Sequence, residues 1–464
     1  MTLTEKATAT TPDRVMTGSG VRHLPITDVG DYLNQLPEDA RAGLRALGEL
    51  LVGVTHRPAG AESADRFTAR CLGVADAGLL VDEDRELNPV SRLTTAVALA
   101  ELITAHSEVV EFGPGARAQP PRWTQTRIGD RTYRHPQCLR AHFPAGTLLP
   151  DTGCVIGIET RQTAMHFPEV SAFATPDHQD AVREVLDRLA ERANELNPYR
   201  GRALRASYSH GLRLTVTDLP VTAARDTVIV DEQVWHELDL GLTAVRDRHD
   251  LLNTHGLGAR RGVLLCGPPG TGKSAVSAVI AAEVVGEFTV IYVEARAGEH
   301  LLTAVIEEAQ RLGGPILLIL EDVDLWCRDR STGGGGLSEL LQAMDIAADA
   351  RILTLASTND PATLDRAAIR TGRFDAIVDI GYPTRADAAR ILTALLTGLP
   401  GADTVDTDTV AAALPEHTSG SDLREIVRRA VLAADDTGLL TTTALLAEVG
   451  SGRYRATPAE GMYL

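Results

Sequence analysis

Gly-Pro-Pro-Gly-Thr-Gly-Lys-Ser, at residues 267–274, is the strongest local signal in this sequence. It fits the pattern GxxxxGK[ST] and lies between an apolar run at residues 262–265 and a helical pattern that opens at Ser274. Glycines in such a loop let backbone N–H groups curve around an anion, and the amino end of the helix adds partial positive charge. The motif predicts a phosphate-binding loop; the alternative is a Gly-rich turn that matches by chance.

The side chains of this loop predict a nucleotide and a metal ion as cofactors. We expect Lys273 to reach the β- and γ-phosphates of ATP and the Ser274 hydroxyl to coordinate Mg²⁺. The backbone N–H groups of the loop would surround the phosphates. The predicted nucleotide-binding residues in this region are Gly267, Pro268, Pro269, Gly270, Thr271, Gly272, Lys273, Ser274 and Ala275.

A pair of acids after an apolar run is the second signal. Residues 316–320 are Ile-Leu-Leu-Ile-Leu, and Glu321 and Asp322 follow directly. In this Walker B pattern the first acid enters the Mg²⁺ shell, and the second orients or deprotonates the water that attacks the γ-phosphate. We therefore assign Glu321 to the metal and Asp322 to the water. The alternatives are an exchange of the two roles and a plain solvated acidic turn.

Short apolar strands alternate with helical segments from about residue 206, which is the pattern of βαβ units on a parallel sheet. The best strand candidates are residues 262–265, 289–293, 316–320 and 352–356. Helices are expected at 385–399, 406–414, 421–434 and 441–449. The predicted fold class is α/β: a P-loop NTPase parallel sheet flanked by helices with a small C-terminal helical lid, preceded by an α+β N-terminal region.

The N-terminal half gives weaker signals. Its first 27 residues are polar without periodicity and predict a tail. Apolar residues recur at helical spacing over 36–52, 90–106 and 178–196, and short β-type runs occur within 123–173. The predicted domains are a flexible tail at 1–28, a helical domain at 29–112, a mixed α/β adaptor domain at 113–205, a nucleotide-binding α/β domain at 206–382, a helical lid at 383–452 and a tail at 453–464.

The strand candidate at 352–356 leads to Asn359 and then to a Thr-Gly-Arg-Phe-Asp run at 371–375. With these motifs, residues from about 260 to 435 closely resemble the AAA ATPases. The resemblance implies that Asn359 positions the attacking water and that Arg370 and Arg373 are arginine fingers. Such arginines neutralise charge at a neighbouring subunit's γ-phosphate, so a homo-oligomeric ring is implied, and in this family a hexamer. A surface salt-bridge pair is the alternative for the two arginines.

Two further runs resemble this family. Residues 418–423 look like its sensor 2 segment, which implies that Gly420 and Ser421 lie near the nucleotide; helix capping by Ser421 is compatible with this. Residues 339–345 are similar to the helix after Walker B in the microtubule-severing and membrane-remodelling clade.

Two features depart from the family pattern. The order of Glu321 and Asp322 is inverted, because most members have Asp and then Glu. Residues 295–298 carry no aromatic side chain at the position where unfoldases of this family grip an unfolded chain, so threading is not expected.

Composition narrows the partners and the location. The 464 residues carry a net charge of -18, which disfavours nucleic acids and anionic membranes as partners. The five cysteines are scattered, with no CxxC pair and no His cluster at metal-ligand spacing, and no apolar stretch of about eighteen residues occurs. We expect a cytoplasmic protein that binds a protein client through its N-terminal region.

One main function and two alternatives follow. The main prediction is an AAA ATPase that binds and hydrolyses ATP and couples this reaction to remodelling, assembly or disassembly of a protein partner. The first alternative is an ATP-regulated ring scaffold or switch with slow hydrolysis. The second, a nucleic-acid-directed motor, is disfavoured by the acidity of the chain and by the lack of a basic tract.

Overall fold

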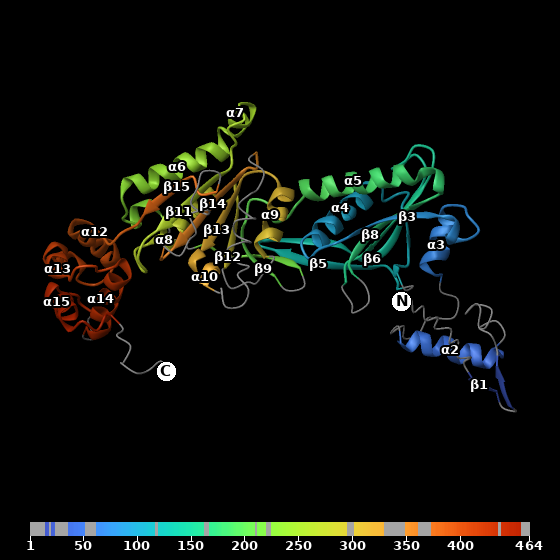
Figure 1. Cartoon of the computed structure of the whole chain (residues 1–464), viewed down its shortest axis with the longest axis horizontal. Helices are drawn as coiled ribbons and strands as arrows, with labels where there is room; N and C mark the ends of the chain where they lie inside the picture. The colour runs from blue at the N-terminus through green and yellow to red at the C-terminus, as the bar shows by residue number, and fades with distance from the viewer. Residues whose placement is uncertain are drawn as a thin grey trace, which may run out of the picture.

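In the computed structural model, most of the described residues form three structural units that follow one another (Figure 1). The described residues are 14–17, 20–23, 36–51, 62–116, 119–161, 167–208, 211–219, 224–294, 301–328, 349–360, 373–434 and 438–455. An N-terminal α+β unit, a central α/β domain and a C-terminal helical lid follow one another along the longest axis (Figure 1). The central domain lies between the other two.

A seven-stranded sheet with the order β10-β9-β12-β13-β14-β11-β15 forms the central domain. Its strands are β9 (Ala203–Tyr208), β10 (Leu212–Val216), β11 (Arg261–Cys266), β12 (Thr289–Glu294), β13 (Ile316–Glu321), β14 (Ile352–Thr358) and β15 (Ala376–Asp379). Neighbouring strands are parallel, except for the antiparallel pair β9 and β10. Because the carboxyl ends of parallel strands meet at one edge, the segments after β11, β13 and β14 meet there.

Helices cover both faces of the central sheet. On one face lie α6 (Glu232–Arg246) and α8 (Lys273–Val284), over a core that contains Leu317. On the other face lies α9 (Leu301–Leu312), over a core that contains the next residue, Leu318. Strands buried on both faces are continuous apolar runs. The four predicted strands, at 262–265, 289–293, 316–320 and 352–356, are therefore confirmed as β11 to β14.

Strand β9 corrects the predicted start of this domain. The boundary between residues 205 and 206 falls inside β9, which pairs in parallel with β12 over Ala203 to Ala206. The sheet therefore begins at Ala203, because long-range pairing with β12 places β9 there and local periodicity does not report such pairing.

The N-terminal unit contains a six-stranded antiparallel sheet with the order β3-β8-β7-β6-β4, and β5 also pairs with β6. Its strands are β3 (Val81–Glu86), β4 (Glu111–Gly113), β5 (Arg122–Ile128), β6 (Arg131–Phe143), β7 (Cys154–Glu159) and β8 (Glu169–Ala174). The helices α4 (Ser91–Ala105) and α5 (Gln179–Glu195) pack on one face of this sheet. The shorter helix α3 (Ala64–Cys71) contacts β4 and β6.

The predicted division between a helical domain and an adaptor domain at residue 112/113 does not hold. It cuts through β4, and β3, which lies on the helical side of the division, pairs with β8. Residues on both sides of the division thus share one sheet. The error arose because β3, Val-Asp-Glu-Asp-Arg-Glu, has a polar face and too few apolar residues to be recognised as a strand.

Shorter elements precede this unit. The strands β1 (Arg14–Thr17) and β2 (Gly20–His23) form an antiparallel pair inside the segment predicted to be a tail. The helix α2 (Glu38–Leu51) confirms the helix expected at 36–52. Likewise, α4 and α5 confirm the helices expected at 90–106 and 178–196.

The lid consists of four helices around one apolar core, as predicted. They are α12 (Arg385–Leu396), α13 (Thr407–Ala413), α14 (Gly420–Ala433) and α15 (Thr442–Ser451). Each helix begins after an N-cap residue whose side-chain oxygen accepts a hydrogen bond from a backbone N–H of the first turn. These N-cap residues are Thr384, Asp406, Ser419 and Thr441 respectively. Among the helices of the described residues, none has the length and apolar character needed to cross a membrane.

The N-terminal unit packs directly on the central domain. Val90, Leu93 and Ile128 belong to the same core as residues of α9 and β13. At this junction the carboxylate of Glu308, which is 3% exposed, accepts a hydrogen bond of 3.5 Å from Asn88 Nδ2. The N-terminal unit therefore contacts the helix α9, which precedes the strand β13 in the chain.

Candidate functional site

The predicted phosphate-binding loop joins the carboxyl end of β11 to the amino end of α8. Three of its glycines have positive φ angles: 149° at Gly267, 79° at Gly270 and 112° at Gly272. A Cβ atom on Gly267 would lie 2.1 Å from the carbonyl oxygen of Ile380, so there is no room for a side chain. The backbone of the loop thus requires glycine, which explains the first part of the motif.

Lys273 is the first residue of α8 and is 6% exposed. Its ammonium group donates hydrogen bonds to the carbonyl oxygens of Gly267 (2.7 Å) and Pro268 (2.8 Å). Burial lowers the pKa of Lys273, and the nearby carboxylates of Asp322 and Asp324 act in the opposite direction. The structure therefore places the predicted lysine near Asp322, the acid predicted to act on the water, and near a second acid, Asp324.

Asp322 lies just beyond the carboxyl end of β13, and its φ angle is +51°. Its backbone N–H donates to Ser357 Oγ over 3.3 Å, and its Oδ1 accepts a hydrogen bond of 2.9 Å from Asn359 Nδ2. Asn359 follows β14, the neighbouring strand. Two residues predicted independently, one from the acid pair and one from the family resemblance, thus touch.

Asp324 is a site residue that the sequence reasoning missed. It is 1% exposed, and its Oδ1 accepts hydrogen bonds from the Asn359 backbone N–H (3.2 Å) and from Thr358 Oγ1 (3.3 Å). The buried carboxylate fixes the turn that carries the Asn359 side chain. A signal was present, since Asp324 is a third acid in the run Glu-Asp-Val-Asp at 321–324.

The lid reaches the loop through the start of α14. The Ser421 N–H donates to the Gly270 carbonyl oxygen over 3.0 Å, and a Cβ on Gly270 would lie 2.1 Å from Ser421 Oγ. Gly420 is the first residue of the helix. The alternative in which Ser421 caps the helix is two residues off, because the N-cap is Ser419, in a reciprocal capping box with Asp422. Ser421 is thereby free of the capping role and contacts the loop.

Arg373 lies at the opposite end of β11 from this loop. A Cβ on Gly262, near the amino end of β11, would lie 2.0 Å from the Arg373 carbonyl oxygen, and the Asp375 N–H donates to the Gly262 carbonyl oxygen over 2.8 Å. At about 3.3 Å per residue, Gly262 and Gly267 are roughly 16 Å apart along the strand. Arg373 is 7% exposed. Arg370 and the runs at 295–298 and 339–345 lie outside the described residues.

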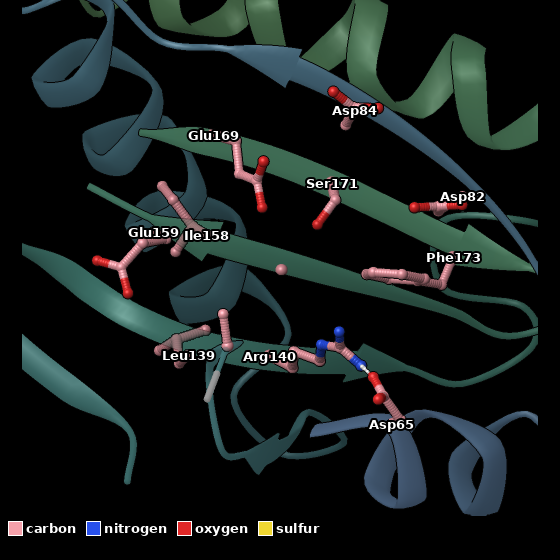
Figure 2. Close-up of a pocket in the computed structure, with 12 residues that line it drawn as sticks. Asp65, Asp82, Asp84, Leu139, Arg140, Ile158, Glu159, Glu169, Ser171 and Phe173 are labelled. Atoms are coloured by element: carbon pink, nitrogen blue, oxygen red, sulfur yellow. Dashed lines mark hydrogen bonds and ion pairs between the residues drawn. The ribbon is translucent and has the colours of Figure 1, made fainter. Parts of the chain in front are cut away.

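A separate hollow of about 390 Å³ lies on the N-terminal sheet, on the face away from α4 and α5 (Figure 2). Its carboxylates come from Asp65, Asp82, Asp84, Glu159 and Glu169. One guanidinium, that of Arg140, lies among them; it is 4.4 Å from the Phe173 ring centroid and donates to Thr68 Oγ1 over 2.6 Å. Burial lowers the pKa of Arg140. Carboxylates in this number repel phosphate groups, so this hollow does not suit a nucleotide.

The donor set at that loop fits Mg-ATP. It combines a glycine cradle that excludes any Cβ at Gly267, a buried ammonium at Lys273, the hydroxyl of Ser274 in the first turn of α8, and acids at the end of β13, which β14 separates from β11 in the sheet. Oxygen ligands of this kind are those that Mg²⁺ prefers, and the helix amino end favours phosphate.

Comparison with known proteins identifies the domain that carries this loop. Residues 263–382 match the family described as "ATPase family associated with various cellular activities (AAA)". The chain is 34% identical over 269 residues to the ATP-dependent zinc metalloprotease FtsH 1 of Conexibacter woesei, covering 54% of this chain and 40% of that protein. It is 33% identical over 250 residues to the FtsH of Mycobacterium leprae, covering 50% of this chain and 31% of that protein.

The chain spans less than half the length of these curated relatives. The family match begins in β11 and ends after β15, so it covers the loop, both acids of the pair, Asn359 and Arg373. No family match covers the N-terminal unit. The chain therefore carries an ATPase domain of the AAA family, with the α/β P-loop fold and with Mg-ATP as its cofactor.

Proposed function

We propose that this chain hydrolyses ATP in an oligomeric ring and uses the reaction to remodel, assemble or disassemble a protein partner. The observation that carries the catalytic part is the 2.9 Å hydrogen bond from Asn359 Nδ2 to Asp322 Oδ1. It joins the family's water-positioning asparagine to the acid at the water-activating position. Both residues belong to the strand edge that also carries the phosphate-binding loop.

Each side chain has a proposed role at this site. Ser274 and Glu321 would hold Mg²⁺, which neutralises phosphate charge when bound. Lys273 would bind the phosphates through its ammonium group. Asp322 would accept the proton of the attacking water, and its contact with Asn359 would hold its carboxylate at one orientation.

Steady-state phosphate release from wild type, Lys273→Ala and Asp322→Asn tests this assignment. We expect both variants to lose hydrolysis, and Asp322→Asn to retain ATP binding because its loop is intact. Exchange of roles between the acids has a distinct result: Glu321→Gln would then abolish turnover with ATP bound, and Asp322→Asn would abolish the Mg²⁺ dependence of binding. Wild type that releases phosphate no faster than Lys273→Ala would contradict hydrolysis.

We propose that the ring is a hexamer completed by Arg370 and Arg373 of a neighbouring subunit. The position of Arg373 supports this, since it lies at the end of β11 opposite its own loop and cannot reach its own phosphate site along the sheet. Because Arg373 is 7% exposed in the single chain, its side chain must turn outward on assembly.

A subunit-mixing assay tests arginines acting between subunits. Arg373→Ala has a functional phosphate-binding loop but lacks the arginine that acts on the neighbouring subunit. Lys273→Ala has this arginine but lacks a functional phosphate-binding loop. Each variant alone should be inactive, and the mixture should regain part of the wild-type rate. Light scattering with and without ATP should give a mass of several subunits. A mixture that stays inactive, or a strict monomer in both states, would contradict the ring.

The client is proposed to be a protein that binds the N-terminal unit in the cytoplasm. The unit packs on α9, which immediately precedes the strand bearing Glu321, so strain at the unit can reach the acid pair. A net charge of -18 favours a protein over a nucleic acid. Affinity capture on Asp322→Asn, with Lys273→Ala as the control, should enrich a client only in the form that holds ATP.

The second candidate function is an ATP-controlled ring switch with slow hydrolysis. The observation that favours it is the aspartate at the water-activating position, one methylene shorter than the glutamate of most family members. Asp322→Glu discriminates the two. A higher turnover in this variant supports a switch whose rate is held down, whereas a loss of turnover supports a site built around aspartate.

A further inference from the structure

Three potential metal ligands converge near the end of α3 on the N-terminal unit. Cys71 is the last residue of α3, Glu111 is the first residue of β4, and His142 lies in β6 directly opposite Glu111 in the antiparallel register. One ligand atom from each, a sulfur, a carboxylate oxygen and an imidazole nitrogen, lies within 4.8 Å of the other two. The residues come from three elements far apart in the chain, so no spacing motif marks them.

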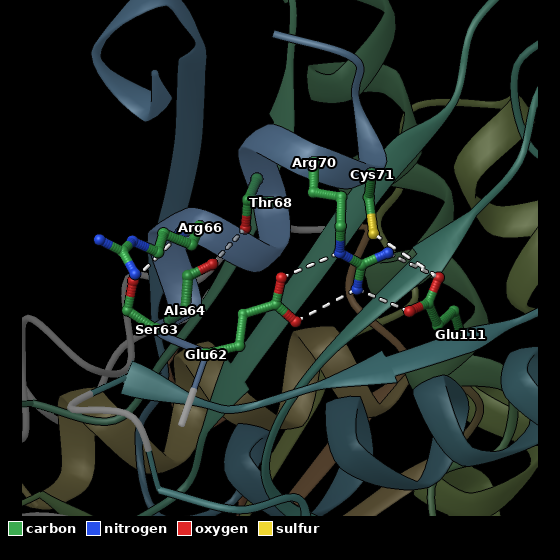
Figure 3. A network of polar contacts seen from close by, with 8 residues as sticks. All are labelled: Glu62, Ser63, Ala64, Arg66, Thr68, Arg70, Cys71 and Glu111. Atoms are coloured by element: carbon green, nitrogen blue, oxygen red, sulfur yellow. Dashed lines mark hydrogen bonds and ion pairs between the residues drawn. The ribbon is translucent and has the colours of Figure 1, made fainter. Parts of the chain in front are cut away.

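The carboxylate of Glu111 is oriented by Arg70 (Figure 3). Arg70 Nη2 donates to Glu111 Oε1 over 2.7 Å, whereas the contact of Nη1 with Oε2 is longer, at 3.3 Å. Oε2 is also the oxygen nearest the thiol, since Cys71 Sγ lies 3.9 Å from it. Both oxygens thus accept hydrogen bonds from the guanidinium, and Oε2, which accepts the longer one, also faces the sulfur.

The positive charge of Arg70 is balanced from its other side. Glu62 accepts hydrogen bonds from Arg70 Nε (2.9 Å) and Nη2 (3.2 Å). Arg70 therefore brings little net charge to the cluster. Ligating carboxylates in metal sites are commonly held by such an outer hydrogen-bond partner, which fixes the direction of the free oxygen. The pairs are solvent-exposed, so the weaker Nη1 contact can be exchanged for a metal bond at small cost.

We propose that Cys71, Glu111 and His142 form a zinc site that ties α3 to the sheet of the N-terminal unit. Thiolate, imidazole and carboxylate are the three ligand types of Zn²⁺ sites, whereas Mg²⁺ and Ca²⁺ select oxygen ligands. Cys71 and His142 are half-buried and Glu111 is exposed, so a water molecule can complete a tetrahedral shell. The thiol releases its proton to solvent when the metal–sulfur bond forms.

Cobalt is the probe for this site, because a thiolate bound to Co²⁺ gives a sulfur-to-metal charge-transfer band in the near ultraviolet. The full-length chain is stripped with a chelator and titrated with Co²⁺ and then Zn²⁺, without nucleotide. We expect one equivalent of Co²⁺ with this band, bleached by Zn²⁺ and unaffected by excess Mg²⁺. Cys71→Ser should lose the band, and His142→Gln should bind at least about tenfold more weakly.

Matched controls keep this result interpretable. His255→Gln replaces an exposed histidine at the end of α7 (His249–Thr254), outside the cluster, and should bind like wild type. Zn²⁺ should raise the Tm of wild type and of Lys273→Ala equally, because the site is independent of the nucleotide loop, and should not raise that of Cys71→Ser. A charge-transfer band that survives in Cys71→Ser, or wild type that binds no Zn²⁺, overturns the proposal. Were Cys71→Ser to unfold, Glu111→Gln and His142→Gln serve as the test by the same band.

Discussion

The central sheet is parallel except for the pair β9 and β10 and is covered by helices on both faces, whereas the N-terminal sheet is antiparallel and carries its two long helices, α4 and α5, on one face. In β13 five consecutive residues are buried, but in β8 buried and half-buried residues alternate. A parallel sheet collects its polar groups at the carboxyl edge, directly after apolar runs. An antiparallel sheet with one open face presents polar groups along its strands instead. Functional polar residues of the central sheet can therefore be recognised in the sequence, because they directly follow apolar runs. In the N-terminal sheet, polar residues are distributed along the strands, and no such pattern marks the functional ones.

The largest effect is expected at the carboxyl edge of the central sheet. Lys273→Ala removes the buried ammonium and should lower ATP hydrolysis by about 10²–10³-fold or more, because charge on the transferring phosphate is then unbalanced. Phosphate release measures this. Arg390→Ala on α12, whose side chain is 63% exposed, is the control and should keep the wild-type rate. Equal rates for the two variants would mean that catalysis is not located at this edge.

Asp324→Asn should have the next largest effect. The substitution weakens the acceptor that holds the Asn359 backbone and Thr358 Oγ1, so Asn359 is displaced from Asp322. We expect kcat to fall by about 10- to 100-fold with unchanged nucleotide Kd, since Asp324 acts through Asn359. Asp250→Asn, on a fully exposed side chain of α7, is the control. A rise in Kd at constant kcat would show that Asp324 supports nucleotide binding instead.

Gly270→Ala should disturb the contact between the loop and the lid. The new Cβ would lie 2.1 Å from Ser421 Oγ, at a residue with a φ angle of +79°. Strain of this kind costs roughly 1–3 kcal/mol, so nucleotide affinity should fall by about tenfold. Gly450→Ala, in α15 with no atom within 4 Å of the new Cβ, is the matched control and should be neutral or stabilising. Isothermal titration of ADP compares the two; equal affinities would exclude a role of the lid contact.

The smallest effect is expected where the two units meet. Burial raises the pKa of Glu308 above the ordinary value for glutamate, so the folded chain binds this proton more tightly than the unfolded chain. The contribution of Glu308 to the free energy of unfolding is therefore fully present at pH values below the ordinary pKa of glutamate. It is lost as the pH rises through the higher pKa that Glu308 has in the folded chain. Glu308→Gln should remove this loss and raise the Tm at neutral pH more than at pH 4.

The neighbouring substitution Glu307→Gln, at an exposed position of α9, is the control for Glu308 and should leave the pH profile of the Tm unchanged. Parallel profiles for wild type and Glu308→Gln would show that the junction does not hold an ionisable proton. Such a result would also weaken the view that the two units are coupled through α9.

The central domain could be predicted closely from the sequence. Apolar runs located β11 to β14 within one or two residues, and the glycines of the loop are required by the positive φ angles and by the carbonyl oxygen of Ile380. The order of the lid helices followed from their periodicity. In contrast, β3 was missed because it has a polar face and few apolar residues, and the start of the domain was misplaced because β9 is positioned by its pairing with β12.

The sequence of this chain specified its nucleotide chemistry, because the residues that bind phosphate and metal follow apolar strands in short, ordered motifs. The fold alone brought Asn359 onto Asp322, placed Ser421 against Gly270, and set Arg373 at the far end of β11. It also gathered Cys71, Glu111 and His142 from three elements. Such groupings depend on strand register and helix packing, which are set by contacts between residues distant in the chain and leave no local pattern.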